Sequence, residues 1–220
     1  VCLMVGQSDR FMPSNQKIKE ILSSGKLGSI GLLRIHRWDA IGSDRANQLG
    51  LDSKNKNMTL IQVVRELDIA NWLFESLPTE LYAVGRKQSN SQMASPDYVQ
   101  IHLGFPNGGM ALIDYSLTLP KGSGYSSLSV IGSTGAAYSD DHHNMHLLYH
   151  GGQPLAVNGE QGTAHIALQI QEFINAIEES RKPAITGPEG RDAVLVAETV
   201  VKSIASGRAA KLTGGSYVLV

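Results

Sequence analysis

One stretch that favours a helix carries the side chains best suited to contact a ligand. Between residues 58 and 74, Ile61, Arg65, Asp68 and Trp72 recur at spacings of four, three and four. Residues three and four apart lie on the same side of a helix, so these four residues form one stripe. Arg65 stays protonated at physiological pH, so it can hold an anion or polarise an oxygen but cannot accept a proton. The stripe therefore predicts recognition of an anion or a hydroxyl group.

Arg65 has a second interpretation, because Asp68 follows it by three residues. An exposed ion pair at this spacing would add only about 0.3–0.5 kcal/mol to stability. It would also leave Arg65 without a functional role. The sequence leaves both interpretations open.

A strand-like segment, residues 30–40, supplies two more substrate-binding candidates. In "SIGLLRIHRWDA", Leu33, Ile35 and Arg37 alternate with His36 and Trp38, which is the period of a β-strand. A strand of this kind could present His36, Arg37 and Trp38 to a cleft. Packing is the competing interpretation and the favoured one, since His and Trp are often half-buried residues of a core.

Histidines are concentrated in "DDHHNMHLLYH", residues 140–150. His142 and His146 would share a helix face, but the flanking segments have strand patterns and no spacing defines a third ligand. Structural metal sites need a closed, preorganised set of ligands. We therefore expect a solvated loop and no metal site.

Hydrophobic periodicity predicts the elements that position these candidates. In the helix over residues 58–74, an apolar arc beside the stripe is expected to be buried: Leu60, Val63, Leu67, Ala70 and Phe74. Other helices are expected over residues 13–24, 164–181 and 188–206, the first ending at Gly25 and the last at Gly207. The apolar run at residues 1–5 is interpreted as a first strand.

Residues 79–140 change to a period of two and contain five short strand candidates, with a tight turn at Asn107-Gly108. Residues 145–150 and 155–157 could extend this run. Strands joined by turns without intervening helices predict an α+β fold, with a large, mainly antiparallel sheet and helices packed on one face. Residues 110–119 carry apolar side chains at both parities, so the other face is available for oligomerisation.

Composition narrows the possible partners. The chain has 220 residues, 42% of them hydrophobic, and a formal net charge of -1. This charge gives no reason to expect nucleic acid or an anionic membrane as a partner, and no apolar run approaches the roughly 20 residues that span a bilayer. The single cysteine, Cys2, favours a reducing compartment, and we expect a cytoplasmic protein.

The first residues, "VCLMVGQSDRF", lack an initiator Met, and the chain is expected to be part of a longer protein. Gly6 is followed by Gln7 and Ser8, whereas a dinucleotide-binding turn needs the spacing G-x-G-x-x-G. We therefore expect no cofactor and no cofactor-binding residue in this chain.

Five phrases, in this order, resemble the C-terminal domain of the glucose-fructose oxidoreductase and inositol dehydrogenase (Gfo/Idh/MocA) family. They are "MVGQSDRFMPSNQKIKEILSSGKLGSIG", "LDIANWLFESLPTELYAVG", "LGFPNGGMALIDYS", "VIGSTGAAY" and "EFINAIEESRKPAITGPEGRDAVLVAETVVKSIASGR". The resemblance implies that residues 1–220 are a single substrate-binding and oligomerisation domain. It also implies that the Rossmann domain, which binds NAD or NADP, lies outside this chain. The implied partners are a sugar or polyol and further copies of the same chain.

The resemblance also implies an altered reaction centre. Family dehydrogenases carry an Asp and a His four residues apart on this helix for proton transfer, and the match places Ile61 and Arg65 at these positions. Neither side chain can transfer that proton, and acid–base help is worth about 10²- to 10⁴-fold in rate. Two functions remain. The chain is the non-catalytic, substrate-binding part of an NAD(P)-dependent oxidoreductase, or it is a binding or scaffold module that has lost catalysis.

Overall fold

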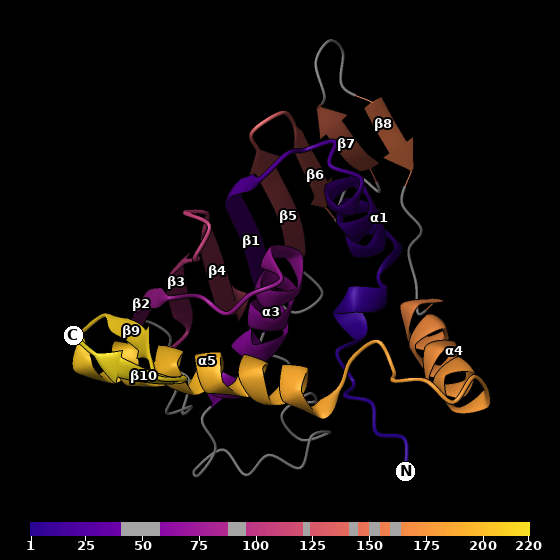
Figure 1. Cartoon of the computed structure of the whole chain (residues 1–220). Coiled ribbons are helices and arrows are strands. Elements are labelled where there is room, and N and C mark those ends of the chain that lie inside the picture. The colour runs from indigo at the N-terminus through magenta and orange to yellow at the C-terminus, as the bar shows by residue number, and fades with distance from the viewer. Residues whose placement is uncertain (41–57, 88–95, 121–123, 141–144, 150–154, 159–163) are drawn as a thin grey trace.

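The computed structural model describes residues 1–40, 58–87, 96–120, 124–140, 145–149, 155–158 and 164–220. Its strands form one 10-stranded sheet in the order β10-β9-β2-β3-β4-β1-β5-β6-β7-β8 (Figure 1). The strands are β1 (Ile30–Ala40), β2 (Glu80–Arg86), β3 (Tyr98–Gly104), β4 (Met110–Leu119), β5 (Tyr125–Gly132), β6 (Ala136–Asp140), β7 (Met145–Tyr149), β8 (Leu155–Asn158), β9 (Ala210–Thr213) and β10 (Ser216–Leu219). The helices are the 3-10 helix η1 (Ser8–Phe11) and the α-helices α1 (Pro13–Ser23), α3 (Met58–Phe74), α4 (Ala164–Glu178) and α5 (Gly187–Ser206).

The sheet is mainly antiparallel, as predicted. The exception is the pairing of β1 with β4, which is parallel and places Ile35 beside Ile113. β1 lies between β4 and β5 near the middle of the sheet, although it precedes both in the chain. The predicted α+β class is confirmed. The central position of β1 was not predicted, because a pattern of alternation carries no information about the neighbouring strand.

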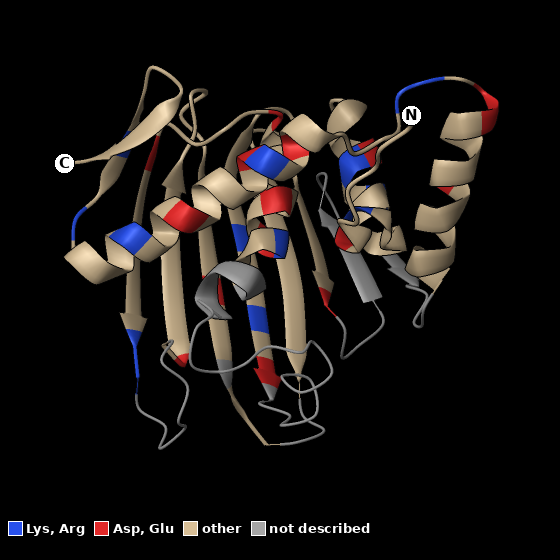
Figure 2. Ribbon diagram, turned by 90° about the horizontal axis from the view of Figure 1, so that it is seen from below, with Lys and Arg blue, Asp and Glu red and all other residues tan. Residues whose placement is uncertain are grey.

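Helices cover one face of this sheet (Figure 2). The core lies between that face and α3 and α5, where Leu33, Ile113 and Val130 of the strands pack with Leu67 of α3 and Val196 of α5. The predicted core arc of α3 is confirmed for its described side chains: Val63, Leu67, Ala70 and Phe74 are buried. The side chain of Leu60 lies outside the described part.

The helix ends follow local rules that the sequence already indicated. Gly25 and Gly207, which follow α1 and α5, both have left-handed backbone with φ of 74° and 68°. Glycine adopts this conformation without steric cost. At its start, α5 has a capping box in which the Glu189 carboxylate accepts hydrogen bonds from the Thr186 backbone N–H and hydroxyl at 2.7 and 3.0 Å.

Two predictions at the ends of the chain need correction. Residues 1–5 form no strand; the Val5 N–H donates to the carbonyl of Ile185 at 3.0 Å instead, and no described strand pairs with this segment. The β9–β10 hairpin was not predicted, although Gly214 and Gly215 at its turn have positive φ. Two strands of four residues are too short for an alternation pattern to be distinguished from a loop.

The histidine-rich segment falls largely on residues 141–144 and 150, outside the described part of the chain. Within that part, no group of three His, Cys, Asp or Glu side chains is arranged to hold a metal ion. None of the described helices has the combination of length and apolar character that crossing a membrane requires.

Candidate functional site

A buried ion pair anchors the stripe on α3 to η1. The Arg10 guanidinium donates two hydrogen bonds to the Asp68 carboxylate, both at 2.7 Å, and a third to Glu189 at 2.9 Å. Only 6% of the Arg10 side chain and 2% of the Asp68 side chain are exposed. The predicted alternative, a surface pair between Arg65 and Asp68, is therefore wrong, because Asp68 is buried and already engaged by Arg10.

A second buried arginine links the sheet to the same helix. Arg37 of β1 donates to Glu66 of α3 and to Asp9 of η1, each at 3.0 Å. Arg37 has the same parity in β1 as the buried Leu33 and Ile35, so it points from the sheet toward α3. This placement of a charge at a core parity was the sequence signal for a buried partner, and sequence reasoning did not use it.

The protonation of these groups follows from burial and pairing. Burial raises the pKa of Asp68, and the hydrogen bonds and charge of Arg10 act in the opposite direction. Burial likewise raises the pKa of Glu66, against the attraction of Arg37. Burial acts to raise the pKa of Glu189, but the hydrogen bonds that it accepts from Thr186 and Arg10 outweigh burial, so the pKa is lowered. These carboxylates hold the two arginines in place, so they are structural groups.

Arg65 differs from Arg10 and Arg37. It is half-buried on the side of α3 that faces away from the sheet, and it makes no hydrogen bond or ion pair with another described residue. Its one recorded electrostatic effect is to lower the pKa of the neighbouring Glu66. The side chain of Ile61 lies outside the described part, so its position relative to Arg65 stays a prediction.

Trp72 lies on the stripe, but both faces of its indole are covered. The Arg10 guanidinium and the Lys19 ammonium each lie 5.7 Å from the ring centroid. Lys19 is held there by the Trp72 carbonyl at 3.0 Å and the Glu75 carboxylate at 2.6 Å. The ring therefore cannot stack on a sugar without displacing one of these cations, which removes the role expected for Trp72.

His36 and Trp38 lie on the opposite face of the sheet. Because alternate residues of a strand point to opposite faces, they point away from α3 while Arg37 points toward it. His36 Nδ1 lies 3.1 Å from Asp114 Oδ2 without the geometry of a hydrogen bond. Trp38 packs against Tyr125 at 5.0 Å between ring centroids and lines a shallow cavity of about 640 Å³.

The five predicted site residues are thus divided between two faces of the domain. Arg65, Asp68 and Trp72 share the outer side of α3, and His36 and Trp38 share the uncovered side of the sheet. No described cavity is lined by members of both groups. A single cleft containing all five is therefore not formed. Sequence reasoning separated the two parities of β1 correctly but could not tell which of them meets α3.

Several known proteins are similar to the chain over most of its length. Residues 15–138, more than half of the chain, match the model of the GFO/IDH/MocA C-terminal domain. The uncharacterized oxidoreductase YrbE of Bacillus subtilis is 26% identical over 94% of this chain and 62% of its own length. The myo-inositol 2-dehydrogenase of Thermotoga maritima is 22% identical over 96% of this chain and 65% of its own length.

Solved structures give the same fold. An oxidoreductase from Agrobacterium radiobacter, in complex with NAD+, L-tartaric acid and magnesium, superposes with a TM-score of 0.83 at 16% identity. The match covers 96% of this chain and 65% of that protein. The chain therefore spans just under two thirds of the length of each of these proteins.

Proposed function

Because the chain belongs to the GFO/IDH/MocA C-terminal domain family, we propose that it is the substrate-binding and oligomerisation domain of an NAD(P)-dependent oxidoreductase acting on a sugar or polyol. The chain covers 62% and 65% of the lengths of its two relatives, and one of them is named a myo-inositol 2-dehydrogenase. NAD or NADP would be bound by the parent protein's other domain. With a single cysteine, Cys2, the cytoplasm is the expected compartment.

The observation that carries this proposal is the free guanidinium of Arg65. Arg10 and Arg37 are saturated by carboxylates, whereas Arg65 has no hydrogen-bonding partner among the described residues. An arginine on the outer side of α3 with five available N–H donors is suited to bind a hydroxyl or carboxylate oxygen. It cannot act as a base, so we assign it to recognition of the ligand and assign no catalytic residue to this chain.

Helix α4 supports a further domain in the parent protein. Four isoleucines at spacings of four, four and three form an exposed stripe: Ile166 (46% exposed), Ile170 (56%), Ile174 (41%) and Ile177 (51%). Ala176, which lies about a third of a turn around α4 from this stripe, is buried. The N-terminus lies close to this helix (Figure 1). We propose that the cofactor-binding domain precedes Val1 and covers the α4 stripe, since exposed apolar stripes mark interfaces.

The uncovered face of the sheet is proposed to bind a second copy of the chain. Its exposed large side chains are Trp38, Tyr82, Tyr98, Met110 and Ile131, each 38–55% exposed. Two carboxylates on this face are already engaged, since Asp114 accepts from Gln100 at 2.8 Å and Asp140 accepts from Tyr138 at 2.8 Å. A sheet face with several exposed apolar and aromatic side chains is typical of an interface, and an identical face of a second copy can cover it.

Calorimetry with D-glucose and with myo-inositol tests the role of Arg65. We expect saturable binding of at least one of them, and a 10- to 150-fold weaker affinity in the Arg65→Ala variant. This corresponds to the loss of about 1.5–3 kcal/mol for a hydrogen bond to a charged group. Arg34→Ala is the matched control, because Arg34 is exposed on the other face of the sheet. Equal affinities of Arg65→Ala and the original chain would contradict the proposal and favour a scaffold module.

A further inference from the structure

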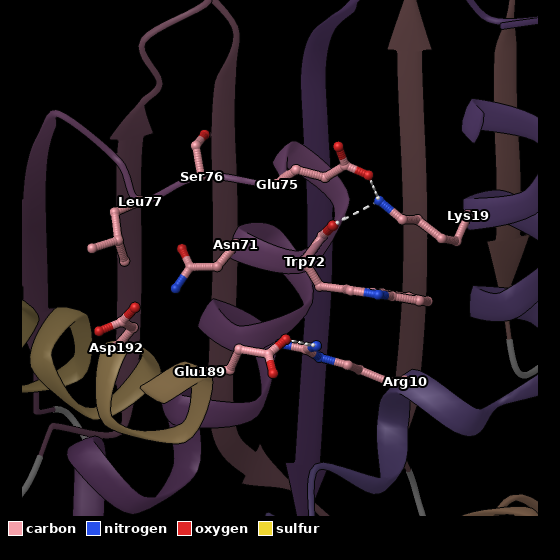
Figure 3. A pocket seen from close by; sticks show the side chains of 9 residues that line it. All are labelled: Arg10, Lys19, Asn71, Trp72, Glu75, Ser76, Leu77, Glu189 and Asp192. Carbon is pink, nitrogen blue, oxygen red and sulfur yellow. Dashed lines mark hydrogen bonds and ion pairs between the residues drawn. The ribbon is translucent and has the colours of Figure 1, made fainter. Parts of the chain in front are cut away.

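A second cavity lies beside the C-terminal half of α3 (Figure 3). It has a volume of about 350 Å³ and is bounded by η1, α1, the start of α5 and the residues that follow α3. Its lining residues are Arg10, Lys19, Asn71, Trp72, Glu75, Ser76, Leu77, Glu189 and Asp192. Arg65 is not among them.

Most of the charged groups in this lining are already occupied. Arg10 is bound by Asp68 and Glu189, and Lys19 is bound by Glu75 and the Trp72 carbonyl. The second oxygen of Glu189 caps α5 at Thr186. These contacts form a preorganised wall on one side of the cavity, and they leave few charged donors or acceptors for a ligand.

Asn71 is the exception. Both polar atoms of its side chain, Nδ2 and Oδ1, are shielded from solvent, and neither has a hydrogen-bond partner among the described residues. Figure 3 shows the amide extending away from Trp72 toward Leu77 and Asp192. Shielded polar groups in folded proteins are almost always paired, and an exception calls for an explanation such as an absent binding partner.

The groups left free around Asn71 define the complementary ligand. The amide offers two N–H donors and one accepting oxygen that have no partner among the described residues, and Leu77 supplies an apolar surface. Asp192 Oδ1 is already engaged, because it accepts from Arg191 at 2.9 and 3.1 Å. A hydroxyl group is both donor and acceptor, so two adjacent hydroxyls satisfy the amide at once. The ionisable lining residues comprise two cations, Arg10 and Lys19, and three carboxylates, Glu75, Glu189 and Asp192, which disfavours an anionic ligand.

We propose that this cavity is a binding site for a small uncharged polyol, in which Asn71 donates to one hydroxyl oxygen and accepts from its neighbour. The site is separate from the one proposed for Arg65. Six residues of α-helix separate Asn71 from Arg65, which corresponds to about 9 Å along the axis and about a third of a turn around it. The inference therefore does not depend on the role assigned to Arg65.

Titration of the ¹⁵N-labelled chain with erythritol, followed by nuclear magnetic resonance, tests this inference. The side-chain amide signal of Asn71 is identified by its loss in Asn71→Leu and Asn71→Asp. We expect a saturable shift of this signal with erythritol, the same shift in the Arg65→Ala variant, and no saturable shift with inorganic phosphate. No saturable shift with erythritol, or an equal shift with phosphate, would overturn the proposal.

Thermal stability provides a second readout that a purely structural role would not produce. Asn71→Leu removes a shielded, unpaired amide, so it is expected to raise the melting temperature of the ligand-free chain by about 2–4 °C. Erythritol should then raise the melting temperature of the original chain more than that of Asn71→Leu. This difference corrects for the general stabilisation that polyols confer on all proteins. Equal increments in the two proteins would contradict binding at Asn71.

Discussion

The ion pair between Arg10 and Asp68 should dominate the stability of the helical layer, and Arg10→Met tests this directly. The substitution removes both 2.7 Å hydrogen bonds to Asp68 and the 2.9 Å bond to Glu189, and it leaves the Asp68 carboxylate buried without its partner. Removing one member of a buried pair costs about 3–5 kcal/mol. Since domains unfold with a free energy of about 5–15 kcal/mol, we expect the loss of about a fifth or more of the total stability.

Urea denaturation followed by circular dichroism in the far ultraviolet measures this loss as a shift of the unfolding midpoint. Lys17→Met is the matched control, because the Lys17–Glu20 pair has a similar distance of 2.8 Å but is exposed, and its loss should cost less than about 0.5 kcal/mol. The double variant Arg10→Met/Asp68→Leu should recover most of the lost stability, since it removes the uncompensated charge. A loss below about 1 kcal/mol in Arg10→Met, or no recovery in the double variant, would refute the reasoning.

The deficit of Arg10→Met should also depend on pH. Burial already raises the pKa of Asp68, and removal of Arg10 should raise it further. A folded-state pKa above the unfolded value means that the folded protein binds the proton more tightly, so stability is gained as pH falls through the folded-state pKa. In the original chain, Arg10 helps to lower the pKa of Glu189, and that contribution to stability is lost as pH falls. Both effects make the free energies of unfolding of the original chain and of Arg10→Met more similar at acidic pH.

Three further predictions follow from the fold and from the proposed domain role. Calorimetry should detect no micromolar binding of NADH or NADPH to the 220-residue chain, because its sequence has no glycine-rich turn of the dinucleotide-binding kind, and such binding would overturn this view. Light scattering should give a mass of at least twice the 23.7 kDa of one chain. A mass of a single chain at high concentration would count against pairing through the sheet. Gly132→Ala should lose about 1–3 kcal/mol because its Cβ would overlap the Leu27 carbonyl, and Gly31→Ala, which has ordinary contacts, is the control.

Periodicity alone was sufficient for most of the elements and for the class of fold. The arc from Val63 to Phe74 is buried as expected, and the five strands predicted between residues 79 and 140 are all present. This success has a local cause, because the repeat of a helix or a strand is a property of the backbone and appears in any stretch that has one buried face. The β9–β10 hairpin was missed because its strands are too short to show that repeat.

The candidate site was only partly predictable. The stripe containing Arg65, Asp68 and Trp72 was found because its members are neighbours on one helix. The partner of Asp68 was not found, because Arg10 lies 58 residues away and a periodic pattern relates only residues within one element. The unpaired amide of Asn71 was also missed, since the absence of a partner is a property of everything that surrounds a side chain.

The sequence by itself determined most of the elements and the α+β class, and it placed Arg65, Asp68 and Trp72 on one side of α3. Only the tertiary structure decided that the sheet directs Arg37 into the helical layer and His36 and Trp38 away from it, so that the predicted site divides between two faces. The physical reason is that alternation along a strand defines two faces but not which one is covered. That choice depends on the packing of α3 and α5 over the sheet, which involves residues far apart in the chain.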